Sequence, residues 1–149
     1  MAKKKVNKLE MSPDLDDSSK EKYLNYLCQQ KDLFTTIIDE ITVLRFSCKK
    51  ALNVTFRKDL SVIEGRFHDM KFAKLPYVFS NKYWCILRYI GECIRLTQVL
   101  FIDCEILCSG HKIDALDKIQ ESLENALEYV IYLIEIIEKP KELHHAPIE

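Results

Sequence analysis

The sequence predicts an all-α protein, a single elongated antiparallel four-helix bundle, on three observations. Glycine and proline are scarce, at 3 and 4 of 149 residues, whereas all-β folds use both in their many turns. Apolar residues recur at the helical spacing of three and four over long segments. Hydrophobic residues make up 48% of the chain and charged residues 30%, which is typical of a globular domain. We assign residues 18–138 to one bundle, between a flexible N-terminal arm (1–17) and a flexible C-terminal tail (139–149).

The first helix is expected to begin near Ser18, because Ser18 and Glu21 have the spacing of a capping box. It is expected to run to about Leu52, roughly 50 Å at 1.5 Å per residue. Two heptad series predict its buried face, which resembles a coiled-coil seam. These residues are Leu27, Phe34, Ile41 and Cys48, with Ile37, Leu44 and Ala51 as the partner series.

The segment from residue 53 to residue 80 is less regular. Asn53-Val54-Thr55 contains mediocre helix formers, so we expect the first helix to break or bend there. Apolar spacing then predicts a second helix to about Phe72, with Ser61 and Glu64 at capping-box spacing and Gly65 as a weak point. Pro76 prevents regular helix in the connector that follows. The sequence leaves open whether residues 53–80 form a second full helix.

The third helix is expected to begin after Ser80 or Asn81 and to run to about Cys108, where Gly110 would act as a left-handed cap. It is apolar nearly all round, which predicts a central helix buried by its neighbours on most sides. Five charged residues interrupt the apolar run and argue against a membrane span. They are Arg88, Glu92, Arg95, Asp103 and Glu105.

The fourth helix is expected to begin near Asp114 and to end before Pro140. Leu127 is predicted to be a core residue of this helix. Its heptad series are Leu116, Leu123, Val130 and Ile137, with Leu127 and Ile134 as the second series. Acidic residues line the opposite face, namely Asp117, Glu121, Glu124, Glu128 and Glu135.

Cysteine occurs six times, in segments with helical apolar spacing, at positions 28, 48, 85, 93, 104 and 108. The chain begins with Met1-Ala2-Lys3 and shows no apolar signal segment. We therefore interpret the cysteines as buried free thiols of a reducing compartment, the cytoplasm or alternatively the nucleus. Cys104, Cys108 and His111 approach a zinc site but have no fourth ligand, and His144-His145 lies in the tail. No metal or cofactor is expected.

The formal net charge is -1, but the charges are unevenly distributed. Arg88, Glu92 and Arg95 form a stripe that is a buried polar network, a partner-recognition surface or a solvated edge stitched by ion pairs. The acidic face of the fourth helix and the basic stretch 45–58 would be complementary edges of one fold if the first and fourth helices are neighbours. A larger basic set is an alternative anion-binding face, made of Lys49, Lys50, Arg57, Lys58, Lys71, Lys74 and Lys82.

The segment from Tyr83 to Ile137 resembles the helical hairpins of the vinculin/α-catenin family. The resemblance rests on the apolar run 85–96, the short break Ser109-Gly110-His111-Lys112 and the apolar helix from Leu116 to Ile137. It implies a long four-helix bundle and a cytoskeletal adaptor at cell contacts, which binds partner helices or filaments. It covers about a third of the chain, rests on layout rather than on a diagnostic motif, and carries over no binding residues.

The sequence contains no Gly-rich phosphate loop, nucleophile elbow or metalloprotease pattern, so we do not expect an enzyme. The prediction is a protein–protein interaction module that binds a partner through a helix or a helical groove, with a homo-oligomer as an option. A lipid- or nucleic-acid-binding bundle and a Bcl-2-like helical regulator are the alternatives. The candidate partner-binding residues are Arg88, Glu92, Arg95, Glu121, Glu124 and Glu128.

Overall fold

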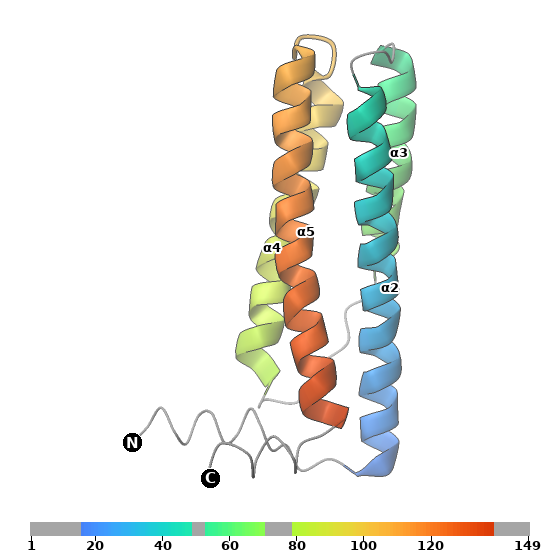
Figure 1. Ribbon diagram of the computed structural model, residues 1–149, viewed down its shortest axis with the longest axis vertical. Helices are drawn as coiled ribbons and strands as arrows, with labels where there is room; N and C mark the ends of the chain where they lie inside the picture. Colours follow the sequence, from blue (N-terminus) through green and yellow to red (C-terminus); the bar gives the residue numbers. More distant parts are fainter. Residues whose placement is uncertain (1–15, 49–52, 71–78, 139–149) are drawn as a thin grey trace, which may run out of the picture.

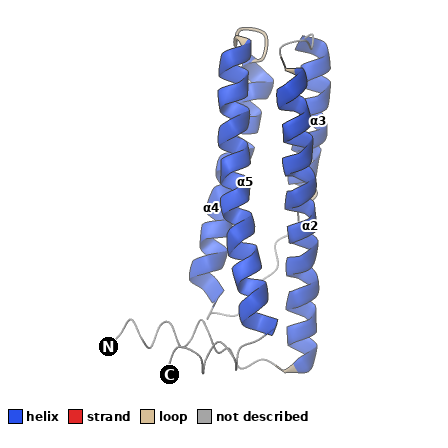
Figure 2. Cartoon of the chain, in the orientation of Figure 1, coloured by secondary structure: helices blue, strands red, loops and turns tan. Residues whose placement is uncertain are grey.

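A computed structural model describes residues 16–48, 53–70 and 79–138 of the chain. These residues form four helices, α2 (Asp17–Ser47), α3 (Asn53–His68), α4 (Ser80–Asp103) and α5 (Ser109–Glu138). The helices lie side by side along the long axis of the molecule, and successive helices run in opposite directions (Figure 1). The described part of the chain contains no strand (Figure 2). The predicted all-α four-helix fold is confirmed.

The N-terminus of α2 is capped by Asp16, two residues before the predicted cap. The Asp16 carboxylate accepts a hydrogen bond of 2.7 Å from the backbone N–H of Ser19, and this bond lowers the pKa of that carboxyl. Ser18 itself lies within the first turn of the helix. The capping box at Ser18 and Glu21 was therefore wrong, because a better placed side chain precedes it.

The heptad face of α2 is confirmed wherever the structure describes it. Every predicted position of the two series up to residue 48 is buried, and Ala51 lies outside the described residues. Gln30 is also buried on this face, in line with the apolar residues. The described helix has 31 residues, which corresponds to about 46 Å.

Helix α2 ends at Ser47 and α3 begins at Asn53, so the two helices are separate, as the expected break implied. The weak helix formers Asn53-Val54-Thr55 form the start of α3. Ser61 and Glu64 lie inside α3, which makes the second capping box wrong. The helix ends at His68, four residues before the predicted end, and its 16 residues make it the shortest of the four. It buries one stripe, made of Phe56, Leu60, Ile63 and Phe67.

Helix α4 buries a single stripe, so the prediction of a central helix was wrong. The stripe follows the spacing of three and four and includes one polar residue, Thr97, whose hydroxyl donates to the Cys93 carbonyl at 2.7 Å. Its remaining buried residues are Ile86, Ile90, Cys93 and Leu100. Other apolar side chains of the segment face outward, namely Trp84, Val99, Ile102 and Ile106. A helix at one corner of a four-helix bundle contacts two neighbours, which leaves its outer side uncovered.

The turn between α4 and α5 also differs from the prediction. Helix α4 ends at Asp103 and α5 begins at Ser109, five residues earlier than expected. Gly110 therefore lies in the first turn of α5, and no described glycine has a positive φ. The left-handed cap at Gly110 was wrong, because the chain turns at residues 104–108 instead.

Helix α5 confirms the first of its two predicted heptad series. Leu116, Leu123, Val130 and Ile137 are all buried. The second series consists of Ile119, Ala126 and Leu133 rather than Leu127 and Ile134. Ile134 is buried beside it, whereas Leu127 is half-buried at the edge of the core. The second series was therefore predicted one residue too far along the chain.

The four helices are not equally well packed. Helix α5 packs most extensively, against α4 on one side and α2 on the other, whereas α3 makes fewer contacts with α2 and α4. The first and fourth predicted helices are thus neighbours. No described helix combines the length and the hydropathy needed to cross a membrane.

Candidate functional site

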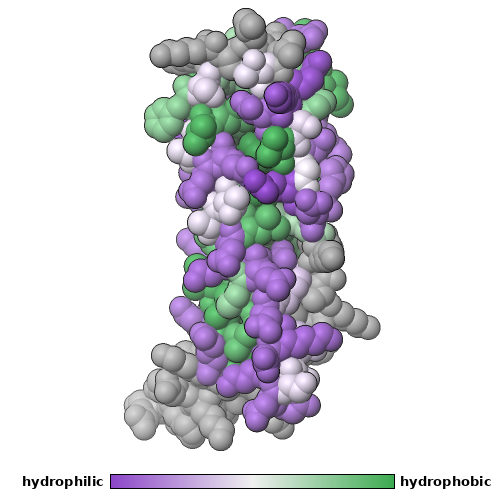
Figure 3. Space-filling view, turned by 90° about the vertical axis from the view of Figure 1, so that its right-hand side faces the viewer, coloured by the Kyte–Doolittle hydropathy of each residue, from purple (hydrophilic) through white to green (hydrophobic). Residues whose placement is uncertain are grey.

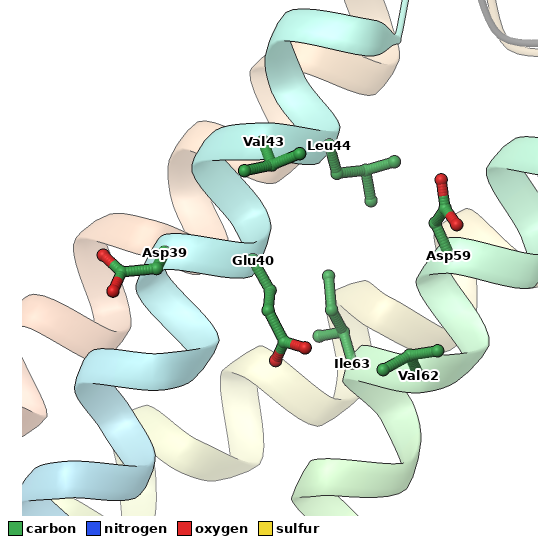
Figure 4. A pocket seen from close by; sticks show the side chains of 7 residues that line it. All are labelled: Asp39, Glu40, Val43, Leu44, Asp59, Val62 and Ile63. Atoms are coloured by element: carbon green, nitrogen blue, oxygen red, sulfur yellow. The ribbon is translucent and has the colours of Figure 1, made fainter.

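The side of the bundle formed by α2 and α3 carries a groove that the sequence did not predict. Its volume is about 340 Å³. Helix α2 contributes one wall and α3 the other, with the space between them open to solvent (Figure 4). The lining residues are Asp39, Glu40, Val43 and Leu44 from α2 and Asp59, Val62 and Ile63 from α3. We call this hollow the α2–α3 groove.

The apolar part of the groove comes from two pairs of consecutive residues. Leu44 and Ile63 belong to the inner stripes of their helices, are buried, and form the floor. Val43 and Val62 precede them in the sequence and line the walls, with exposed fractions of 68% and 50%. Successive residues point about 100° apart around a helix, so the neighbour of a core residue lies on the flank. Here the two flanks line one groove.

Phe46 is a further exposed apolar residue of α2, outside the lining of the groove. It follows Val43 by three residues, which places it on the same side of the helix one turn further on, and 81% of its surface is exposed. On the face that Figure 3 shows, hydrophobic side chains form separate patches among hydrophilic ones in the upper part of the molecule. Exposed apolar surface with polar margins is a feature of binding surfaces.

Three carboxylates line the groove, and no lysine or arginine is among its lining residues. The Glu40 carboxylate accepts two hydrogen bonds from the Arg66 guanidinium, at 2.6 Å from Nε and 2.8 Å from Nη2. These bonds raise the pKa of Arg66 and join α2 to α3. In the described part of the chain, Asp39 and Asp59 take part in no ion pair, and both are exposed. The rim of the groove is therefore negatively charged.

Comparisons of the chain with protein-family models, curated proteins and solved structures gave no match. The resemblance to vinculin/α-catenin hairpins thus stays a prediction from helix layout. The break at Ser109–Lys112 on which it partly rested lies inside α5. The function of the chain has to be argued from its own surfaces.

A second hollow, of about 410 Å³, lies between α4 and α5 and includes two of the residues predicted to bind a partner. It is lined by Cys85, Arg88, Tyr89, Glu92 and Ser122. The Glu92 carboxylate accepts a hydrogen bond of 3.1 Å from Arg95 Nε, which lowers the pKa of Glu92 and raises that of Arg95. The stripe 88–95 thus contains an ion pair within one helix, and Arg88 and Arg95 are exposed.

Three tyrosines line the α4–α5 side. The rings of Tyr89 and Tyr129 stack with their centroids 6.1 Å apart. Lys82 Nζ lies 5.6 Å from the ring centroid of Tyr129 and 5.5 Å from that of Tyr132. These tyrosines are half-buried against the core.

The acidic face of α5 is exposed as predicted. Glu121, Glu124 and Glu128 all face solvent, and none of them is in an ion pair with another described residue. The contact with α2 is made instead by Asp117, whose carboxylate lies 3.0 Å from Nη1 of Arg45. The same nitrogen donates to the side-chain oxygen of Gln120. The α2–α5 edge is thus complementary in charge at Arg45 and Asp117, and the three glutamates lie about one to three turns further along α5.

The predicted basic face is only partly described, because Lys49, Lys50, Lys71 and Lys74 lie outside the described residues. Arg57 Nη2 lies 3.7 Å from the Glu105 carboxylate, and its guanidinium lies 5.8 Å from the ring centroid of Phe101. Lys58 is exposed, and Lys82 lies over the tyrosines of α5. The described cations therefore point to different parts of the bundle.

The cysteines separate into three environments, and all six are free thiols. Cys48, Cys93 and Cys104 are buried, as predicted for core positions. Cys28 and Cys108 are exposed, so the expectation that all six are buried was wrong. Burial raises the pKa of Cys93 to about 12.

The Cys104, Cys108 and His111 set is spread between core and surface. Cys104 is buried, whereas Cys108 and His111 are exposed. Within the described residues, no group of three or more His, Cys, Asp or Glu side chains is arranged to hold a metal ion. His144-His145 lies outside the described residues.

Proposed function

We propose that this chain is a non-enzymatic protein–protein interaction module and that its binding surface is the α2–α3 groove. The observation that carries the proposal is the pair Val43 and Val62, which stand exposed on facing walls above a buried apolar floor. Burial of apolar surface stabilises by about 25 cal/mol per Å². A partner that covers this patch, together with Phe46, removes apolar surface from water and so gains binding free energy.

The other hollow supports a binding role less well. The space between α4 and α5 is lined by charged and hydroxyl-bearing side chains, and its arginine and glutamate belong to a stripe that already contains an ion pair. Exposed ion pairs of this kind contribute about 0–1 kcal/mol. A partner that docks there has to replace hydrated charges and gains little apolar burial.

The alternatives are not favoured by the described surfaces. A lipid- or nucleic-acid-binding face needs cations gathered on one surface, but Arg45, Arg57 and Arg66 each pair with a carboxylate. A Bcl-2-like bundle needs a central apolar helix, whereas each described helix has an exposed side. The proposal includes an adaptor role in the cytoskeleton or in cell adhesion, which the helical layout supports. It also includes a place in the cytoplasm or nucleus, which the free thiols support.

Affinity purification with mass spectrometry from the source cell tests the proposal. Three baits are compared: the wild type, Val43→Ser/Val62→Ser, and Val99→Ser, which removes an exposed valine from α4. Circular dichroism first establishes that the three baits fold alike. Proteins captured by the wild type and by Val99→Ser but lost from the groove variant support the proposal. Capture that is identical with all three baits contradicts it.

A further inference from the structure

We propose that the occupant of the α2–α3 groove is an amphipathic helix of a partner protein, with an aliphatic inner face flanked by lysine or arginine. This inference rests on the proposed function and specifies the partner. It is drawn from the shape of the groove, from the row of apolar side chains along α2, and from the charge of the rim.

The shape of the groove fits a helix. Its two walls are the flanks of helices that run side by side (Figure 1), and a third helix packs into such a furrow as it does between two helices of a bundle. The floor residues Leu44 and Ile63 offer apolar contacts at the bottom of the furrow (Figure 4). A volume of about 340 Å³ is small for the 300–1,000 Å³ pockets that enclose ligands, and here it is open along one side. It suits a row of inserted side chains.

The apolar residues are spaced for helix recognition. Val43 lines the groove on α2, and Phe46 is exposed about one turn further along the same helix, beyond the lining residues. Val62 lines the wall opposite Val43. A partner helix with aliphatic residues at i, i+3, i+4 and i+7 places consecutive anchors at the same interval.

The rim selects the charge of the partner. Asp39 of α2 and Asp59 of α3 are both among the lining residues, so each helix contributes an aspartate to the groove. Both are exposed and in no ion pair within the described residues, whereas Glu40 is neutralised by Arg66. A helix with acidic flanks would bring like charges together across this rim, and a helix with basic flanks would bring opposite charges together. The rim thus favours a basic partner.

Two synthetic peptides test this inference by fluorescence anisotropy. Each has about 18 residues, five turns of helix, with the same leucine face. One peptide carries lysine on both flanks and the other carries glutamate. The lysine peptide is expected to bind the wild type with measurable affinity, and the glutamate peptide at least about tenfold more weakly, as several rim contacts of 0.2–1 kcal/mol each would give.

Charge reversal in the protein provides the matched half of the experiment. Asp39→Lys/Asp59→Lys should invert the preference, so that the glutamate peptide binds more tightly than the lysine peptide. Glu135→Lys/Glu138→Lys makes the same change in net charge on the exposed side of α5 and should leave the preference as in the wild type. Val43→Ser/Val62→Ser should weaken the lysine peptide without a change in charge, whereas Val99→Ser should not.

The outcomes separate this inference from the proposed function. Equal binding of the two peptides, abolished by Val43→Ser/Val62→Ser, overturns the basic partner and leaves the groove as a binding surface. Absence of binding by the lysine peptide, or binding that the groove variants leave unchanged, overturns the inference as well. The proposed function fails separately, in the affinity purification, if capture is independent of Val43 and Val62.

Discussion

Arg66 of α3 and Glu40 of α2 form a bidentate ion pair, with guanidinium nitrogens 2.6 Å and 2.8 Å from the carboxylate oxygens. The two residues are 26 positions apart in the sequence. Their contact crosses the interface between α2 and the helix that is packed least extensively in the bundle. Because Glu40 also lines the α2–α3 groove, the same ion pair that ties α3 to α2 sets the spacing of the groove walls.

Glu40→Gln should loosen α3 without unfolding the bundle. The variant keeps the size of the side chain but removes the charge that orients Arg66, so α3 amides should exchange with deuterium faster than in the wild type. Amides of α5 should be unchanged. Glu92→Gln is the control, since it breaks the bidentate pair with Arg95 inside α4 and spans no helix interface. Equal exchange in α3 for both variants and the wild type would show that the ion pair does not hold this helix.

Gly65→Ala should stabilise the protein by about 0.5–1 kcal/mol. Gly65 lies inside α3, and a Cβ added there would have no neighbour within 4 Å. Alanine therefore restricts the unfolded chain without a clash in the folded one. Gly91→Ala in α4 is equally open and should show a gain of the same order. Urea denaturation measures both, and a loss of stability at Gly65 would mean that α3 is strained there.

The sequence predicted helix faces better than helix ends. Heptad spacing identified the buried faces of α2 and α5, because burial of a stripe is a collective property of many residues. The end of a helix depends on which single residue caps it, and neighbouring residues compete for that position. Asp16 rather than Ser18 caps α2, and Gly110 lies inside α5 because that helix begins earlier than predicted. Such choices involve about 1 kcal/mol each, which a pattern does not resolve.

Leu123→Ala should destabilise the protein by about 2–5 kcal/mol, the usual cost of a cavity in a core. Leu127→Ala should cost less, because Leu127 is half-buried at the edge of the core while Leu123 is fully buried. Glu128→Ala, on the solvent side of α5, should cost less than about 0.5 kcal/mol. Denaturant unfolding of the three variants ranks the sites. A loss at Leu127 as large as that at Leu123 would restore the core position that the sequence predicted for Leu127.

The candidate groove could not be predicted from the sequence, for a physical reason. The exposed apolar residues Val43, Phe46 and Val62 lie outside the heptad series of their helices. Such a position in the sequence does not show whether a residue belongs to a binding surface or packs against a third helix. On α5, Ile136 also lies outside the heptad series but is buried. The difference arises from the short length of α3 and its limited packing, which only the assembled bundle reveals.

Thiol reactivity should divide the cysteines by burial. Cys28 and Cys108 are exposed and should react rapidly with a thiol reagent in the native protein. The buried set, Cys48, Cys93 and Cys104, should react only after unfolding, with half-buried Cys85 in between. Mass spectrometry of labelled peptides under native and denaturing conditions assigns each site. Rapid native labelling of the buried set would contradict the packing of the core around α4.

Cys93 should make the protein less stable at high pH. Burial raises the pKa of its thiol from 9.0 to about 12 in the folded protein. Between these values the unfolded chain loses a proton that the folded chain keeps, so the free energy of unfolding falls as pH rises, by up to about 1.4 kcal/mol per pH unit. Cys93→Ala removes this contribution. Its loss of stability between pH 9 and pH 10.5 should therefore be smaller than that of the wild type, and parallel curves would refute this.

Reversing the charges on the acidic face of α5 tests whether they stabilise the bundle or bind a partner. Helices α2 and α5 are neighbours, but their opposite charges meet at Arg45 and Asp117, while the three glutamates of the face point to solvent. Glu121→Lys/Glu124→Lys/Glu128→Lys should therefore change the free energy of unfolding by less than about 1 kcal/mol, at low and at high salt alike. Asp117→Lys, which places two cations together, should lower stability at low salt and less at high salt, where the repulsion is screened. Thermal unfolding at two salt concentrations measures both variants. A marked loss for the triple variant at low salt would identify the glutamates as internal counter-charges of the basic stretch, whereas unchanged stability with the loss of a captured partner would make them a second binding surface.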